Sequence, residues 1–177
     1  GILEEMFAGI GGEILYRPMN GSFAIGAELW SVQQRDYDML FSLLDYKTET
    51  GHINFYYEEP KTNIILALKG GRFLAGDSGI NVDFSRRFKS GLRMGAFFSI
   101  TDISKEEFGE GSFDKGFSFY IPLEIFSNSF NSRHFGWGLK PITRDGGAIL
   151  VHAHNLWGVT HKSHKRKFNR HIADFYD

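Results

Sequence analysis

Residues 78–102 alternate between apolar and polar side chains over two runs of about ten residues each. Ile80, Val82 and Phe84 are the apolar positions of the first run, and the alternation resumes after the turn at residues 89–91. Successive side chains of a β-strand point to opposite faces, so each run predicts a strand with one apolar and one polar face. The short turn between the two runs predicts an antiparallel hairpin.

The same alternation recurs along most of the chain. It predicts about nine strands, near residues 12–17, 23–30, 52–57, 64–68, 80–87, 92–101, 113–121, 134–140 and 149–159. Short connections such as PMNG, EEPKT and KSG alternate with longer ones such as DYDMLFSLLD and DISKEEFGEG. This order favours an up-and-down antiparallel meander with short connections at one end of the strands and longer ones at the other.

Strands of this kind suit two environments. In a soluble sandwich or barrel the apolar face is the core, whereas in a transmembrane barrel it faces lipid and the polar face lines the lumen. Runs of about ten residues match a tilted membrane strand better than the usual soluble strand of about 5–6 residues. Aromatic residues near strand ends also suit an interfacial girdle; they are Tyr16, Tyr56, Tyr57, Phe88, Tyr120 and Trp157. We therefore expect an all-β, up-and-down transmembrane β-barrel, or its C-terminal part, and keep the soluble β-domain as the alternative.

Composition removes several classes of function. Lys and Arg total 20 against 21 Asp and Glu, so the formal net charge of -1 does not predict a nucleic-acid partner. Cysteine is absent, which excludes disulfides, thiol chemistry and cysteine metal sites. The Gly-rich GGRFLAGD lacks the Lys-Ser/Thr ending of a phosphate loop. His152 and His154 have a spacing that can ligate a metal, but without a third ligand we read them as lumen-facing polar residues, and we expect no cofactor.

The polar faces supply the candidate contact residues. In a barrel, the lumen would receive side chains of both charge signs, which can pair across strands or bind sugar hydroxyls or an acidic polymer. Arg144 and Asp145, in the segment TRDGGA, are read either as a grip on a carbohydrate or as local turn chemistry. A lumen closed by its own ion pairs, with no ligand, is the alternative for the whole set. The candidates are Glu28, His52, Asp83, Arg87, Arg93, Asp114, Arg144 and Asp145, with Asn54 and Lys140 also expected on the lumen side.

Four spaced blocks carry a resemblance to a known family. They are GILEEMFAGIGGEILYRP at residues 1–18, GGRFLAGDSG at 70–79, FGEGSFDKGF at 108–117 and KPITRDGGA at 140–148. With them the chain resembles the YjbH family, also called the GfcD-like family of capsule-biosynthesis outer-membrane proteins. The resemblance runs from Gly1 to about Trp157. It implies an outer-membrane β-barrel of a Gram-negative cell, made with an exopolysaccharide or capsule export system, and it implies that this chain is the C-terminal portion of a longer protein.

The resemblance and the pattern together predict two regions. Residues 1–159 would be a β-barrel segment, and residues 160–177 would be a basic amphipathic tail, with a short helix, on the periplasmic side. We expect a non-catalytic protein that assists export or surface assembly of an exopolysaccharide. Its partners would be outer-membrane lipid, the polymer and other proteins of the export system. The alternatives are a soluble periplasmic carbohydrate-binding β-domain and an outer-membrane barrel enzyme acting on lipid or polymer.

Overall fold

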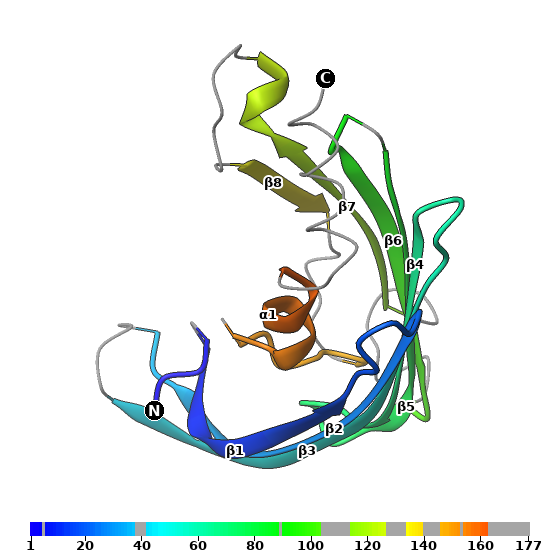
Figure 1. Ribbon diagram of the computed structural model, residues 1–177. Helices are drawn as coiled ribbons and strands as arrows, with labels where there is room; N and C mark the ends of the chain where they lie inside the picture. Colours follow the sequence, from blue (N-terminus) through cyan, green and yellow to red (C-terminus); the bar gives the residue numbers. More distant parts are fainter. Residues whose placement is uncertain are drawn as a thin grey trace.

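The computed structural model describes residues 1–4, 6–37, 42–88, 90–103, 114–126, 134–139, 146–152 and 154–162. Eight strands form one antiparallel sheet, ordered along the chain from β1 to β8 (Figure 1). The strands are β1 Phe7–Tyr16, β2 Phe23–Arg35, β3 Leu43–Glu58, β4 Ile64–Arg72, β5 Ser78–Arg87, β6 Arg93–Thr101, β7 Asp114–Pro122 and β8 His134–Leu139. A 3-10 turn, η1 (Leu123–Phe126), and one short helix, α1 (Leu156–Lys162), complete the described elements.

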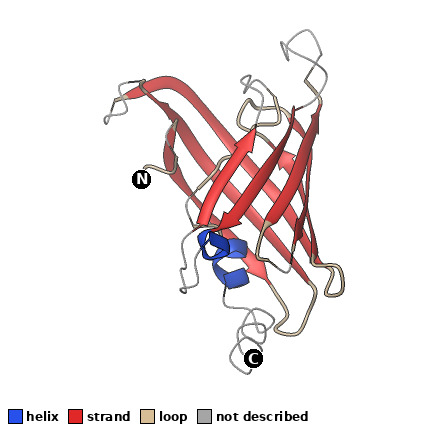
Figure 2. Ribbon diagram, turned by 90° about the horizontal axis from the view of Figure 1, so that it is seen from above, coloured by secondary structure: helices blue, strands red, loops and turns tan. Residues whose placement is uncertain are grey.

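The sheet bends into an arc, and α1 lies on its concave side (Figure 1). The strands run side by side as a single layer when seen from above (Figure 2). Every neighbouring pair is antiparallel, which confirms the predicted all-β meander. Each connection therefore joins strands that are adjacent in space, as in a series of hairpins.

The two faces of the sheet differ in chemistry. Tyr56 stacks on Trp157 of α1, so the even-numbered positions of β3 face the concave side. The odd-numbered positions face outward, and Ile53 is 69% exposed there. Cross-strand register extends this division to the other strands, because paired residues share a face. Large apolar side chains consequently cover the convex face; they include Ile14, Leu29, Ile53, Ile80, Phe84, Phe98, Ile100 and Trp137.

A small apolar cluster sits on the concave side. Val32, Leu74 and Leu150 are each less than a tenth exposed and contact one another, and Leu3 and Phe7 pack against them. The cluster therefore joins the beginning of the chain to a segment near its end. We call that segment the strap: residues 146–152 and 154–162, which include α1.

Hydrogen bonds tie the strap to the wall along its length. The Gly147 amide donates to Asp77 Oδ2 at 2.7 Å, and the Leu74 amide donates to the Ala148 carbonyl at 3.0 Å. Further along, the strap donates backbone N–H groups to two carboxylates near the start of the chain. These bonds are Val151 N to Glu4 Oε2 at 3.0 Å and Leu156 N to Glu13 Oε2 at 2.8 Å.

The predicted ninth strand, residues 149–159, is wrong. Eight strands are present among the described residues, and the strap takes the place of the ninth. The side-chain oxygen of Asn155 accepts a hydrogen bond from the Gly158 amide at 2.6 Å, which caps the start of α1. Because α1 occupies residues 156–162, it crosses the predicted boundary between residues 159 and 160. That division into a wall and a tail stays a prediction, and residues 163–177 lie outside the described residues.

The sequence predicted a barrel or the C-terminal part of one, and these eight strands do not close into a barrel. β1 pairs with β2, β8 pairs with β7, and the described strands include no β1–β8 pairing. The two strands lie at opposite ends of the arc (Figure 1). Closure requires backbone pairing between the first and last strands, and β8, with six residues, pairs only along residues 117–122 of β7.

The predicted interfacial girdle is wrong at three of its members, and one of them, Tyr120, lies on the concave side as the register partner of Arg93. Tyr56 and Trp157 stack on each other on the concave side, and Tyr56 is only 4% exposed. None of the helices among the described residues has the length and hydropathy needed to cross a membrane.

Candidate functional site

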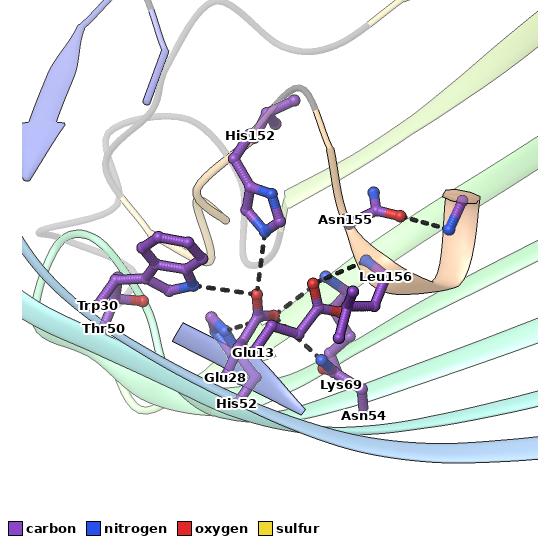
Figure 3. Close-up of polar contacts among 12 residues, drawn as sticks. Glu13, Glu28, Trp30, Thr50, His52, Asn54, Lys69, His152, Asn155 and Leu156 are labelled. Carbon is purple, nitrogen blue, oxygen red and sulfur yellow. Dashed lines mark hydrogen bonds and ion pairs between the residues drawn. The ribbon is translucent and has the colours of Figure 1, made fainter. Parts of the chain in front are cut away.

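A polar cluster around Glu28 occupies the concave face of β2, β3 and β4 (Figure 3). Glu28 Oε1 accepts hydrogen bonds from Asn54 Nδ2 at 3.2 Å and Lys69 Nζ at 3.3 Å. The same oxygen lies 3.5 Å from Nδ1 of His52. Glu28 Oε2 accepts a hydrogen bond from Trp30 Nε1 at 3.3 Å, and it lies 3.5 Å from Nε2 of His152 on the strap.

Burial makes these contacts energetically important. The side chain of Glu28 is 4% exposed and that of His52 is 1% exposed, whereas Lys69 keeps 22% of its side chain in contact with solvent. Moving a carboxylate out of water costs several kcal/mol, and that cost is offset here by an ammonium group and several hydrogen-bond donors. The carboxylate of Glu28 is thus a paired charge centre near the middle of the wall.

Strand register explains why these residues meet. Glu28 lies directly opposite Glu13 on β1 and opposite His52 on β3. Asn54 lies two positions along β3, on the same face, and opposite Lys69 on β4. Two carboxylates facing each other across strands repel. The Leu156 amide of the strap binds one of them and the Lys69 ammonium binds the other, which relieves that repulsion.

Two buried polar atoms in the cluster have no hydrogen-bond partner among the described residues. They are Nε2 of His52 and Oδ1 of Asn54, and both residues are less than a tenth exposed. A buried group of this kind ordinarily pairs with protein or with ordered water. Because Nδ1 of His52 lies toward Glu28, Nε2 of the neutral ring is an acceptor, so both of these atoms are acceptors buried beneath the concave surface.

The two histidines of the strap have different surroundings. His152 contacts Glu28 and packs against the ring of Trp30 at a centroid distance of 4.8 Å, while His154 is exposed. In the described part of the chain no group of three His, Asp or Glu side chains has the geometry for a metal ion. His152 is therefore a member of the Glu28 cluster.

The remaining candidate residues lie further along the same face. Asp83, Arg87 and Arg93 occupy concave positions on β5 and β6, and Asp114 begins β7 opposite Ser99. The structure thus brings together Glu28 and His52, and it places the other four on neighbouring strands. Arg144 and Asp145, with Lys140, lie outside the described residues. The neighbouring Gly147 has a φ of 71°, which agrees with turn chemistry for the Gly-Gly part of TRDGGA.

Two residues that hold this side of the sheet were not among the predicted contacts: Lys69, in the cluster, and Asp77, outside it. Lys69 ends the run in which Ile65 and Ala67 share its face, so counting by twos along β4 would have placed it on the concave side. Asp77 lies in the turn after β4, and no pattern in the sequence signals its bond to Gly147.

Comparisons with known proteins bear on the whole chain. The family model for YjbH, described as "Exopolysaccharide biosynthesis protein YbjH", matches residues 1–162. An Escherichia coli (strain K12) protein named "Uncharacterized lipoprotein YjbH" is 38% identical over 165 residues. That match covers 90% of this chain and 24% of the relative, so the chain spans about a quarter of the relative's length. No solved structure matches the chain. The alternating strands, the polar concave face and these two matches agree, and the chain belongs to the YjbH family of exopolysaccharide biosynthesis proteins.

Proposed function

We propose that this chain is part of an outer-membrane β-barrel wall that assists export or surface assembly of an exopolysaccharide without catalysing a reaction. The observation that carries the proposal is the distribution of side chains over the sheet. Apolar side chains project from the convex face, and polar and charged side chains line the concave face. A wall between lipid and a hydrated interior requires this arrangement.

Exposure distinguishes the proposal from its soluble alternative. A soluble domain would bury the apolar faces of its strands as a core, yet Ile14, Leu29 and Ile53 are each more than two-thirds exposed. Large contiguous apolar surfaces in water are rare and mark contact with a partner or a membrane. Contact with lipid would remove these apolar side chains from water, so their exposed fractions favour the transmembrane interpretation over the soluble one.

The family description suggests that the ligand is an exopolysaccharide. Members of the matched family are described as exopolysaccharide biosynthesis proteins, and the Escherichia coli relative is named a lipoprotein, which suits a cell-envelope location. Sugar hydroxyls both donate and accept hydrogen bonds, so they match a surface that carries hydroxyl, amide and charged groups. The wall would then guide the polymer or present it to other proteins of the export system.

The test uses the complete gene product, expressed with its native leader in a Gram-negative host. Inner and outer membranes are separated, and the outer fraction is run on gels with and without boiling. We expect urea-resistant protein in the outer fraction with a mobility that changes on boiling, and loss of surface polymer when the gene is deleted. Soluble periplasmic protein with no mobility change would refute the membrane proposal, because the apolar faces would then have to be buried against protein.

A further inference from the structure

One side chain of the strap lies between two side chains of the wall. The Trp157 indole lies 4.3 Å from the Tyr56 ring, centroid to centroid, and the Arg17 guanidinium carbon lies 4.3 Å from the centroid of the same indole. Ala24 on β2 is the register partner of Tyr56 and is completely buried. β1 ends one residue before Arg17, which brings Arg17 into line with Ala24. Arg17, Ala24 and Tyr56 therefore form one row, and we call the space over Ala24 the slot.

The slot has the width of one flat ring. Neighbouring strands are about 4.8 Å apart, so side chains on the outer two of three strands stand about 9.6 Å apart. The two 4.3 Å separations from the indole nearly fill that width. Because the side chain of Ala24 is a single methyl group, the middle of the row is left open to a ring.

The sides of the slot belong to the sheet rather than to the strap. Tyr56 is part of β3, and so is Glu58, two positions along on the same face. The Arg17 guanidinium lies 3.8 Å from Glu58 Oε2, and the two side chains are 8% and 10% exposed. This ion pair fixes the arginine to the wall. The slot would consequently keep both sides when Trp157 leaves it.

The docking of α1 is weaker than the pairing of the strands. α1 has seven residues, and an isolated helix shorter than about 12–15 residues is only marginally stable in water. The bond from the Leu156 amide to Glu13 joins residues 143 positions apart, so it forms only when α1 docks. Val159, on the same helix, is half-exposed. Segments held by few buried contacts open locally more easily than the centre of a sheet, so we expect Trp157 to leave the slot while the wall stays folded.

The polar groups around the slot favour an uncharged sugar. Leu156 and Trp157 are adjacent, so the Glu13 carboxylate that binds the Leu156 amide lies beside the slot (Figure 3). With the strap away, this carboxylate lacks that donor, and a sugar hydroxyl can replace it. The Tyr56 ring adds an apolar surface, and binding sites for organic ligands combine such surfaces with a few placed polar groups. A ligand carboxylate, in contrast, would be repelled by Glu13 and by Glu58, which already has a cationic partner.

We propose that the slot binds an uncharged pyranose ring of the polymer and that Trp157 occupies the slot in the absence of polymer. The C–H face of the sugar packs on the Tyr56 ring, a hydroxyl of the same or the next unit donates to Glu13, and the end of the strap is displaced. The strap is thus a competitor that covers the binding surface until a sugar chain arrives. The inference rests on the proposed function and narrows its ligand to a polymer with uncharged units.

Binding to the complete protein tests the slot, in a detergent whose head group is not a sugar. The probe is cellohexaose, titrated by calorimetry, and a galacturonic acid hexamer is the charged comparison. We expect cellohexaose to bind at least about tenfold more tightly than the acidic hexamer, because like charges oppose the latter. Trp157→Ala should raise the affinity for cellohexaose by about fivefold or more, since apparent affinity rises with the population of the binding-competent state.

Two further variants test the slot itself. In the Trp157→Ala protein, Tyr56→Ala removes one side of the slot and Ala24→Val fills its floor. Each should weaken the binding of cellohexaose by about tenfold or more, because each removes the surface on which the sugar ring packs. Val159→Ala, at a half-exposed position of α1, is the control and should leave the wild-type affinity unchanged. Boiling-dependent gel mobility verifies that each variant folds.

Displacement of the strap is measured by cleavage within residues 154–162 by an added protease. Cellohexaose should accelerate this cleavage in the wild-type protein, and the acidic hexamer should leave it unchanged. Three results would overturn the proposal: no binding of cellohexaose to the Trp157→Ala protein, equal affinities of the wild-type and Trp157→Ala proteins, and strap cleavage that is slower or unchanged with cellohexaose bound. Outer-membrane location and loss of polymer on deletion are measured separately, so the slot can fail while the proposed function stands.

Discussion

The rings of Tyr56 and Trp157 stack with their centroids 4.3 Å apart and their planes 4° from parallel. Tyr56 belongs to the centre of the wall and Trp157 to the strap, so this pair fastens α1 to the concave face. Arg17 covers the same indole, with its guanidinium carbon 4.3 Å from the ring centroid, and donates a hydrogen bond to Thr160 at 3.4 Å. The end of the strap is therefore held by stacking and by a cation–π contact together.

Replacing Trp157 with Ala should loosen this attachment without unfolding the sheet. Aromatic stacking contributes about 0.5–1.5 kcal/mol beyond area burial. The Arg17 side chain is only 8% exposed, so its cation–π contact contributes about 2 kcal/mol. We expect faster cleavage within residues 154–162 by a protease added to detergent-solubilised protein. Val159→Ala, at a half-exposed position of the same helix, is the control. Equal cleavage rates in Trp157→Ala and wild type would show that the stack does not hold the strap.

Removing the charge centre should have a larger effect. Glu28→Ala leaves Lys69 and Asn54 without their carboxylate partner, and breaking a buried ion pair costs about 3–5 kcal/mol. Glu28→Gln keeps an acceptor oxygen and should cost less. The measurement is the urea concentration at which the boiling-dependent gel mobility is lost. Glu49→Ala, on the exposed side of β3, is the control and should leave that concentration unchanged. A urea midpoint for Glu28→Ala equal to that of the wild-type protein would contradict the role given to the cluster.

Gly147 is expected to tolerate no side chain. Its φ of 71° lies in the left-handed region, and an added Cβ would lie 2.5 Å from Ser99 Cβ. Gly147→Ala should destabilise the strap by about 1–3 kcal/mol, because it strains the turn and weakens the bonds to Asp77 and Ser99. Hydrogen exchange at the strap amides measures the effect. Gly12→Ala is the matched control, as nothing lies within 4 Å of the added methyl group; greater exchange in the Gly12 variant than in the Gly147 variant would count against this account.

The Ile53→Lys substitution distinguishes the membrane interpretation from the soluble one, because the two predict different effects on the amount of folded protein. Ile53 is 69% exposed at the middle of β3. In lipid, a lysine near the bilayer midplane costs about 2–4 kcal/mol, so Ile53→Lys should reduce the amount of folded protein in the outer membrane. In water the same change would be neutral or would raise solubility. Ile53→Leu serves as the apolar control. Unchanged outer-membrane levels of the lysine variant would argue against a lipid-facing convex side.

Alternation was sufficient to predict which residues share a face. Glu28, His52 and Asn54 fall on one side because side-chain direction in a strand repeats every two residues, whatever the strand pairs with. Their meeting then follows from the meander, in which neighbours along the chain are neighbours in the sheet. The contact of His152 with Glu28 could not be predicted this way, since it depends on where the strap crosses the sheet.

The error at residues 149–159 has an identifiable cause. Leu156 and Trp157 are adjacent apolar residues that break the alternation, and Leu156 and Val159 have the i, i+3 spacing of a helix. Asn155 precedes them as a helix cap. Closure of the sheet lay beyond any periodicity argument, because it depends on strand number and tilt, which side-chain alternation does not report.

The order of folding follows from how far apart the strap's partners are in the chain. Bonds from the strap to Glu4 and Glu13 join residues 147 and 143 positions apart, whereas each hairpin joins adjacent strands. Closing a long loop costs more entropy than closing a short turn, and local contacts form faster. We therefore expect the hairpins to assemble first and the strap to dock last, with strap amides gaining hydrogen-exchange protection after those of β2 and β3. Until that moment Glu28 would lack its contact with His152, so the final step of folding is also the step that completes the charge centre.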